Sequence, residues 1–111
     1  MSLSDATLRV STLDTFRLAV AEIPEAVAPH VRYILSGILD LLDSNNRQNP
    51  IDVRVAALKC LGQFPGSLSY DVLRPHLSYV TKQLVKPLDD RKRLVRREAV
   101  ECRAKWYAIA A

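Results

Sequence analysis

Residues 29–43 read PHVRYILSGILDLLD, and residues 75–89 read PHLSYVTKQLVKPLD. Laid over each other at an offset of 46 residues, the two segments share their Pro-His start, their tyrosine and their final Leu-Asp pair. Their aliphatic positions also match. A period in the forties is typical of solenoids built from two-helix units. Such proteins present extended surfaces to partners, so the pattern favours a binding module over a buried catalytic site.

The segment that follows each copy is repeated as well. VRVAALKCL begins at Val53 and VRREAVECR begins at Val95, while a partial third copy begins at Leu8. The chain therefore starts halfway through a unit. We expect a fragment of a longer array in which residues 1–3 are an expression remnant.

Apolar residues at helical spacing predict five helices and no strand. We place the helices at about residues 4–22, 26–43, 51–63, 69–86 and 91–109 of a single domain that spans residues 1–111. Short connections make successive helices antiparallel neighbours. The predicted fold is therefore all-α, an α-solenoid of about two and a half helix pairs.

Capping residues and prolines set the expected ends of these helices. Ser4 or Asp5 is expected to cap the first helix, and Pro24 to end it. Pro75 lies a full turn inside the fourth helix, where it should cause a bend. Two further breaks are expected at the third and fourth helices, which should end at Pro65 and Pro87.

Composition and motifs argue against several classes of protein. The chain is 49% hydrophobic and 25% charged, as in ordinary globular domains, and no apolar run is long enough for a membrane span. Cys60 and Cys102 fall on apolar stripes, where we expect two buried small side chains rather than metal ligands. No phosphate-binding loop or triad spacing is present. We therefore predict neither enzyme activity nor a cofactor or metal site.

Charged residues recur at fixed places in the units. Three arginines occupy one position of the second helices, and two aspartates end the first helices. An aspartate that faced an arginine of the same or the next unit would form a ladder of ion pairs along the stack. The predicted structural ladder consists of Arg9, Asp43, Arg54, Asp89 and Arg96.

Positive charge is concentrated in the last helix. Residues 1–90 have a formal charge of −1 and residues 91–111 have +5, within the total of +4. At 100° per residue, the apolar side chains of the last helix occupy one narrow arc, and most of its cations lie on the adjoining arc. The candidate partner-binding residues on that arc are Lys92, Arg93, Arg97, Arg103 and Tyr107.

Three interpretations of this cationic arc remain open. It is a solvated face that caps the array, or a binding surface for an acidic protein, or a contact to nucleic acid phosphates. Arginine and tyrosine are enriched in the hot spots of protein interfaces, which favours the protein partner. We do not expect direct nucleic acid binding, because no base-reading motif accompanies the cations and the remaining chain is slightly acidic.

Specific residues resemble a known family. The helix pair, with Asp at the end of the first helix and Val-Arg opening the second, is similar to the HEAT repeat. Residues 87–106, PLDDRKRLVRREAVECRAKW, resemble the extreme C-terminal repeat of the MMS-nineteen family of nucleotide-excision-repair and cytosolic iron–sulfur assembly scaffolds. Lys92 to Val100 match the family's basic run, with Cys102 where alanine is common and Trp106 as the aromatic residue.

This resemblance implies a function. The family is a non-catalytic adaptor of the cytosolic iron–sulfur targeting complex, active in the cytoplasm and nucleus. Its C-terminal repeats are expected to hold a WD40-propeller protein and a MIP-type adaptor, and the assembly delivers clusters to DNA-repair and replication enzymes. Self-association of the fragment through its exposed first helix remains a further possibility.

Overall fold

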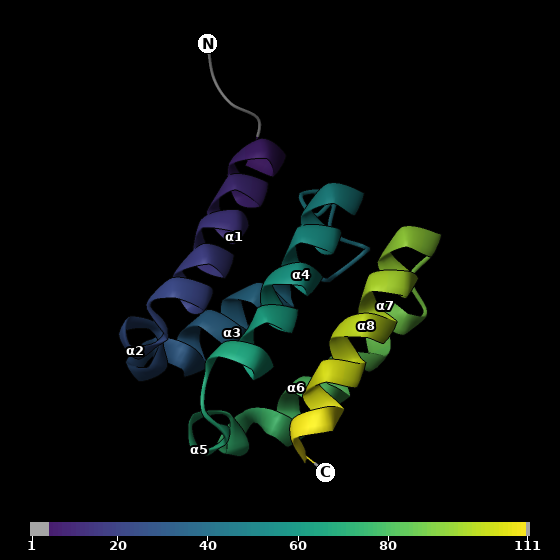
Figure 1. Ribbon diagram of the computed structural model, residues 1–111. Helices are drawn as coiled ribbons and strands as arrows, with labels where there is room; N and C mark the ends of the chain where they lie inside the picture. Colours follow the sequence, from purple (N-terminus) through teal and green to yellow (C-terminus); the bar gives the residue numbers. More distant parts are fainter. Residues whose placement is uncertain (1–4, 111) are drawn as a thin grey trace.

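The computed structural model describes residues 5–110, and Ser4 and residues 1–3 lie outside the described residues. Three helices are continuous: α1 (Asp5–Glu22), α4 (Ile51–Ser67) and α8 (Arg93–Ala110). The segments between them are broken into shorter pieces (Figure 1). The first consists of α2 (Pro24–Val27), η1 (Ala28–His30) and α3 (Val31–Asp40). The second consists of α5 (Tyr70–Leu73), η2 (Arg74–His76), α6 (Leu77–Gln83) and α7 (Val85–Leu88).

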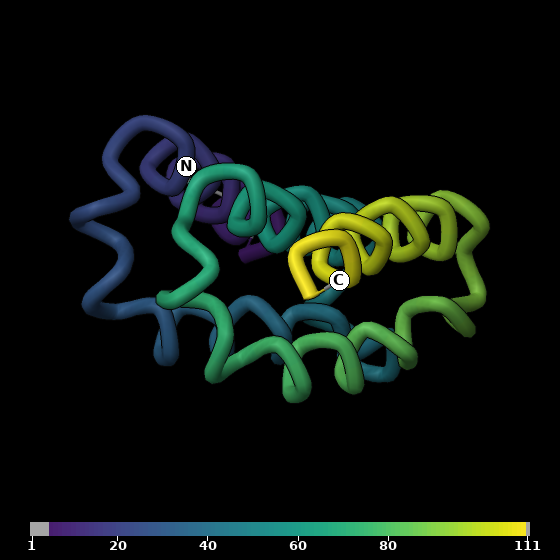
Figure 2. The backbone as a smooth tube through the Cα atoms, turned by 60° about the horizontal axis from the view of Figure 1, so that its bottom comes forward, coloured from purple at the N-terminus to yellow at the C-terminus, as the bar shows by residue number. Residues whose placement is uncertain are grey.

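The helices form two layers. Figure 2 shows α1, α4 and α8 in one row, with the α2–α3 and α5–α7 segments in a second row beside them. Within the first row α4 lies between α1 and α8, and α3 contacts both α4 and α6. Between residues 5 and 110 there is no strand. The predicted all-α solenoid of antiparallel helix pairs is confirmed.

The expected bend at Pro75 is confirmed, and Pro29 causes the same break in the preceding unit. Each proline is the second residue of a 3₁₀ turn, η1 or η2, that separates two α-helical pieces. A proline inside a helix lacks an amide donor, and its ring collides with the carbonyl four residues earlier. The tighter 3₁₀ turn accommodates this ring.

Pro65 and Pro87 do not end their helices, and these two predictions are wrong. Helix α4 continues through Pro65 to Ser67, and Pro87 lies inside the single turn of α7. Pro65 has no amide N–H, so it cannot donate the helical hydrogen bond to the carbonyl of Leu61, four residues earlier. The indole Nε1 of Trp106 donates to that carbonyl at 3.0 Å, so the missing backbone hydrogen bond is replaced from α8.

Other helix ends also differ from the prediction. The expected helix at 26–43 starts at Pro24 and stops at Asp40, and residues 41 and 42 form a turn instead of a last helical turn. The fourth expected helix runs on to Leu88, and the last begins at Arg93 rather than residue 91. Its start is fixed by Asp90, whose Oδ1 accepts a hydrogen bond from the backbone N–H of Lys92 at 2.9 Å.

The core lies between the two layers and joins all the units. Trp106 of α8 is fully buried, and its ring lies 6.4 Å from that of Phe64 of α4 at an interplanar angle of 30°. Cys60 and Cys102 are buried as predicted. Asn49 is a fully buried polar side chain. The large aliphatic side chains that are fully buried come from every unit: Val20, Leu35, Val53, Leu58, Leu61, Leu73, Val80, Leu84 and Val95.

Candidate functional site

A buried ion pair joins α4 to the loop in front of α8. The Nε of Arg54 donates to Oδ2 of Asp90 at 2.8 Å, and its Nη2 donates to Oδ1 at 3.1 Å. The remaining nitrogen, Nη1, donates to the carbonyl of Asn49 at 2.6 Å. All three residues are buried. Because the carboxylate is held in bidentate geometry, this contact is more specific than an exposed ion pair.

The predicted ladder is therefore wrong in its aspartates. Asp43 accepts a hydrogen bond from the backbone N–H of Asn45, and Asp89 is exposed, while its neighbour Asp90 faces inward. Within residues 5–110, the only ion pair is the one between Arg54 and Asp90. The Asp43 carboxylate binds the turn that follows it and Asp89 is exposed, and neither forms an ion pair within residues 5–110.

The other two arginines of the ladder bind backbone carbonyls. Arg9 of α1 donates to the carbonyl of Gln48 and to its side-chain oxygen, both at 2.9 Å. Arg96 donates to the carbonyl of Asp90 at 2.7 Å. Arg9 and Arg54 thus share one arrangement, in which an arginine of a second helix reaches the loop of the following unit.

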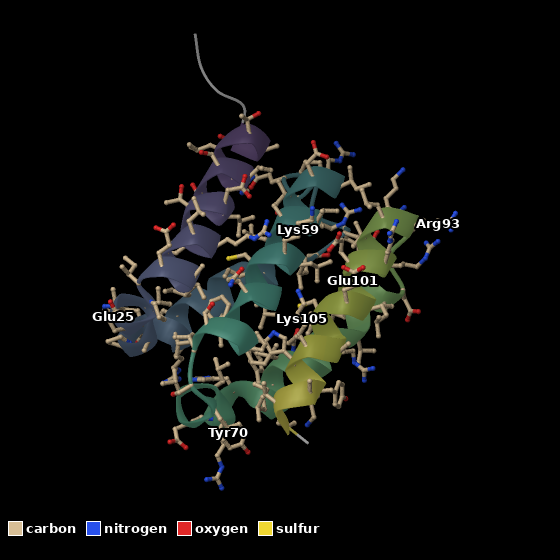
Figure 3. The ribbon with its side chains drawn as sticks, in the orientation of Figure 1. Glu25, Lys59, Tyr70, Arg93, Glu101 and Lys105 are labelled. Carbon is tan, nitrogen blue, oxygen red and sulfur yellow. The ribbon has the colours of Figure 1, made fainter. Side chains whose placement is uncertain are left out.

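Four of the five candidate partner-binding residues lie on α8 and Lys92 comes directly before it, and helical spacing places them on the side away from α4. The opposite side is in contact with α4, where the Lys105 side chain reaches Gly62. Figure 3 shows Lys105 and Glu101 on the α4 side of the helix, with Arg93 pointing outward at its beginning. We call the outward surface formed by Lys92, Arg93, Arg97, Arg103 and Tyr107 the cationic strip.

The cations of the strip differ in how they are held. Lys92, Arg93 and Arg97 are exposed. The guanidinium of Arg103 lies 4.6 Å from the centre of the Tyr107 ring, and its Nη2 donates to the tyrosine hydroxyl at 2.9 Å. The Nε of Arg103 is buried and, within the part of the chain that the structure describes, has no hydrogen-bond partner. Arg103 and Tyr107 therefore form a fixed pair beside three exposed cations.

The cationic strip occupies positions that are apolar in the preceding unit. At an offset of 42 residues, Arg93, Arg97 and Arg103 correspond to apolar residues of α4, namely Ile51, Val55 and Leu61. In α4, which lies between α1 and α8, Leu61 is buried and the other two are partly buried against the core. In α8 the same positions carry charge, so the strip is unsuited to another helix of the α4 type.

Burial makes the two thiols unreactive. Desolvation raises the pKa of Cys60 and that of Cys102 from the ordinary value of 9.0 to about 12. We expect neither thiol to be alkylated by iodoacetamide at pH 8 in the native chain, and both to react in guanidinium, as measured by mass spectrometry. Rapid labelling of the native chain would contradict this prediction.

The raised pKa of the two thiols also makes the free energy of unfolding depend on pH. Between pH 9 and about 12 the unfolded chain releases thiol protons that the folded chain retains, so the free energy of unfolding should fall as the pH rises. Urea unfolding at pH 8 and pH 10 measures this fall. A variant with both cysteines replaced by alanine serves as the control, because its fall should be smaller.

Neither a metal centre nor a membrane span is seen in residues 5–110. No three His, Cys, Asp or Glu side chains of that range are placed so that they could hold a metal ion. None of its helices has the length and apolar character needed to cross a bilayer.

The chain is similar to a known protein family and to several curated proteins. The family described as RNAPII transcription regulator C-terminal (MMS19_C) matches residues 1–65. The MMS19 nucleotide excision repair protein homolog of Mus musculus is 37% identical over 109 residues, which cover 98% of this chain and 10% of that protein. The Homo sapiens protein of the same name is 36% identical with the same coverage.

A fungal protein shows the same level of similarity. The DNA repair/transcription protein mms19 of Schizosaccharomyces pombe is 36% identical over 107 residues, or 96% of this chain and 10% of that protein. The chain thus spans about a tenth of the length of the curated relatives it matches.

Proposed function

Because the chain belongs to the MMS19 family, whose members are named as DNA repair and transcription proteins, we propose that it is a non-catalytic module that binds an acidic protein partner through the cationic strip. The observation that carries this proposal is the exchange of apolar positions of α4 for arginines in α8. Charges that prevent another helix from packing, and that make no ion pair within residues 5–110, are available to a partner.

The chemistry of the strip supports a protein partner with carboxylates. Arg93 and Arg97 are four residues apart and stand on one side of α8, so they can bind acidic side chains on a facing helix or loop. Arg103 and Tyr107 add an ordered aromatic surface of the kind that dominates interface hot spots. Val100, which is 58% exposed, stands three residues after Arg97 and three before Arg103, and it adds apolar contact area.

The wider role follows from the resemblance of the last helix. The partners would be a WD40-propeller protein and a MIP-type adaptor of the cytosolic iron–sulfur assembly machinery. Bound to them, the module would take part in delivering clusters to DNA-repair and replication enzymes, in the cytoplasm and the nucleus. Because the chain spans a tenth of its relatives, these assignments concern a role within a larger scaffold.

Charge reversal of the strip tests this proposal. Arg93→Glu with Arg97→Glu should weaken binding of the purified adaptor at least tenfold, because two attractive contacts become repulsive. The melting temperature should change little, since both side chains are exposed. Isothermal titration calorimetry with the MIP-type adaptor and with the propeller protein measures the affinity.

A matched control carries the same change in charge elsewhere. Arg32→Glu with Arg74→Glu reverses two exposed arginines of the other layer and should leave the affinity unchanged. Equal binding by the strip variant and the control would refute the proposal. Binding of duplex DNA that weakens steeply with salt and is lost in the strip variant would instead favour the nucleic acid alternative.

A further inference from the structure

An apolar groove lies at the opposite end of the stack from the cationic strip. It runs between α1 and α3 and has a volume of about 670 Å³. Three of the large exposed apolar side chains line it, with Leu8 52%, Phe16 37% and Tyr33 77% accessible. Contiguous apolar surface of this kind is typical of binding sites on globular proteins.

The unit repeat shows what fills the same place elsewhere in the molecule. At an offset of 45 residues, Leu8 and Phe16 correspond to Val53 and Leu61 of α4, which are fully buried. The wall formed by Ile34 of α3 corresponds, at an offset of 46, to the fully buried Val80 of α6. The covering element is α3, which contacts both α4 and α6.

The face that α3 uses for this contact is known from its neighbours. Leu35 lies beside His76 and Tyr79 in the space between α3 and α6. Leu39 and Leu42 lie beside Gln83 and Lys86 one and two turns further on. All three leucines are buried; Leu35 and Leu39 lie one turn apart on one stripe of α3, and Leu42 lies in the turn that follows it. A helix with this stripe has the shape and chemistry that the groove requires.

We infer that the groove between α1 and α3 is the binding site of a further helix of the α3 type, supplied by another unit of a longer family chain. The helix would bind α1 and α3 as α3 itself binds α4 and α6. The Mus musculus relative is about ten times as long as this chain, which is ample length for such a unit. The site is independent of the strip, because it lies on other helices at the other end.

A tethered copy of the first-helix segment tests the inference. Joining a second copy of residues 24–50 directly ahead of Ala6, the position equivalent to Ile51, places the helix beside the groove at high effective concentration. We expect the melting temperature to rise by at least about 5 °C, because Leu8, Phe16 and Tyr33 become covered. Amide hydrogen exchange in α1 should also slow at least tenfold.

The matched control carries Leu35→Glu and Leu39→Glu in the added copy only, and it should show neither effect. Leu8→Glu in the tethered chain should abolish the gain as well. An unchanged melting temperature with the native copy, or an equal rise with the control copy, would overturn the inference. So would a dimer of the unmodified chain in sedimentation velocity that Leu8→Glu dissociates, because the groove would then belong to a second copy.

Discussion

Trp106→Ala should lower the free energy of unfolding by about 3–5 kcal/mol, the range observed when a buried aromatic side chain is truncated. Trp106 is fully buried and stacks on Phe64 of the neighbouring helix. Domains of this size have a total stability of about 5–15 kcal/mol. The loss would therefore leave α8 weakly attached, or unfolded, at 37 °C.

Part of this loss is specific to the proline in α4. The indole N–H of Trp106 is the donor that reaches the Leu61 carbonyl, which Pro65 leaves without its helical partner. Truncation of the indole leaves that carbonyl buried and unpaired, at a cost of about 1–3 kcal/mol. Trp106→Phe helps to separate the two contributions, because it keeps an aromatic ring in the core and removes the donor together with part of the ring volume.

Urea unfolding followed by circular dichroism measures these changes. Tyr107→Ala is the matched control, since Tyr107 is the next aromatic residue of the same helix and is 47% exposed. It should cost less than about 1 kcal/mol. A loss for Trp106→Ala no larger than that of the control would show that α8 is not held by its core face.

Arg54→Met is expected to have the second-largest effect, a loss of about 3–5 kcal/mol. The substitution removes one partner of a buried ion pair, and Asp90 keeps an uncompensated charge in a buried site. It also removes the donor to the Asn49 carbonyl. Methionine fills a similar volume, so lost packing contributes little to the change.

A second substitution isolates the charge. In the double variant Arg54→Met with Asp90→Asn, the charge of Asp90 is gone, while its side chain can still accept the hydrogen bond from Lys92. This variant should be more stable than Arg54→Met alone by at least about 1 kcal/mol. Arg9→Met is the control, because its contacts to Gln48 are exposed and should cost at most about 1 kcal/mol. A double variant less stable than Arg54→Met would show that the buried charge is not the source of the loss.

The repeat in the sequence was sufficient to predict the helical class, the antiparallel order and the buried cysteines. Its periodicity also placed the apolar stripe of α8. The breaks were harder to predict, because a proline can end a helix, bend it or remain inside it according to its tertiary contacts. Pro65 remains inside α4 because Trp106, 41 positions later, serves the carbonyl that the proline leaves free.

The candidate site was only partly accessible from the sequence. A helical wheel placed Lys92, Arg93 and Arg97 on an exposed side of the last helix; all three are exposed in the structure, although Lys92 precedes α8. The ladder was predicted from the recurring Asp43 and Asp89, each facing an arginine of its own or the next unit. The partner of Arg54 is instead the non-recurring Asp90, which comes from the unit that follows Arg54. Whether Asp89 or Asp90 points inward depends on the conformation of the turn between α7 and α8, and the sequence repeat does not predict that conformation. The place of Asp90 just ahead of the helix could have indicated the choice, since Asp is a preferred capping residue and its Oδ1 accepts a hydrogen bond from the N–H of Lys92.

The forward reach of Arg9 and Arg54 bears on how the chain melts. In a linear array the stability divides into the free energy of each unit alone and the coupling between nearest neighbours. Arg9 links α1 to the unit of α4, and Arg54 and the stacked Trp106 link that unit to the unit of α8, so separation at either junction loses at least one of these contacts. Coupling of this strength makes partly melted arrays rare. The three units should therefore unfold in a single cooperative transition, and not one after another from an end.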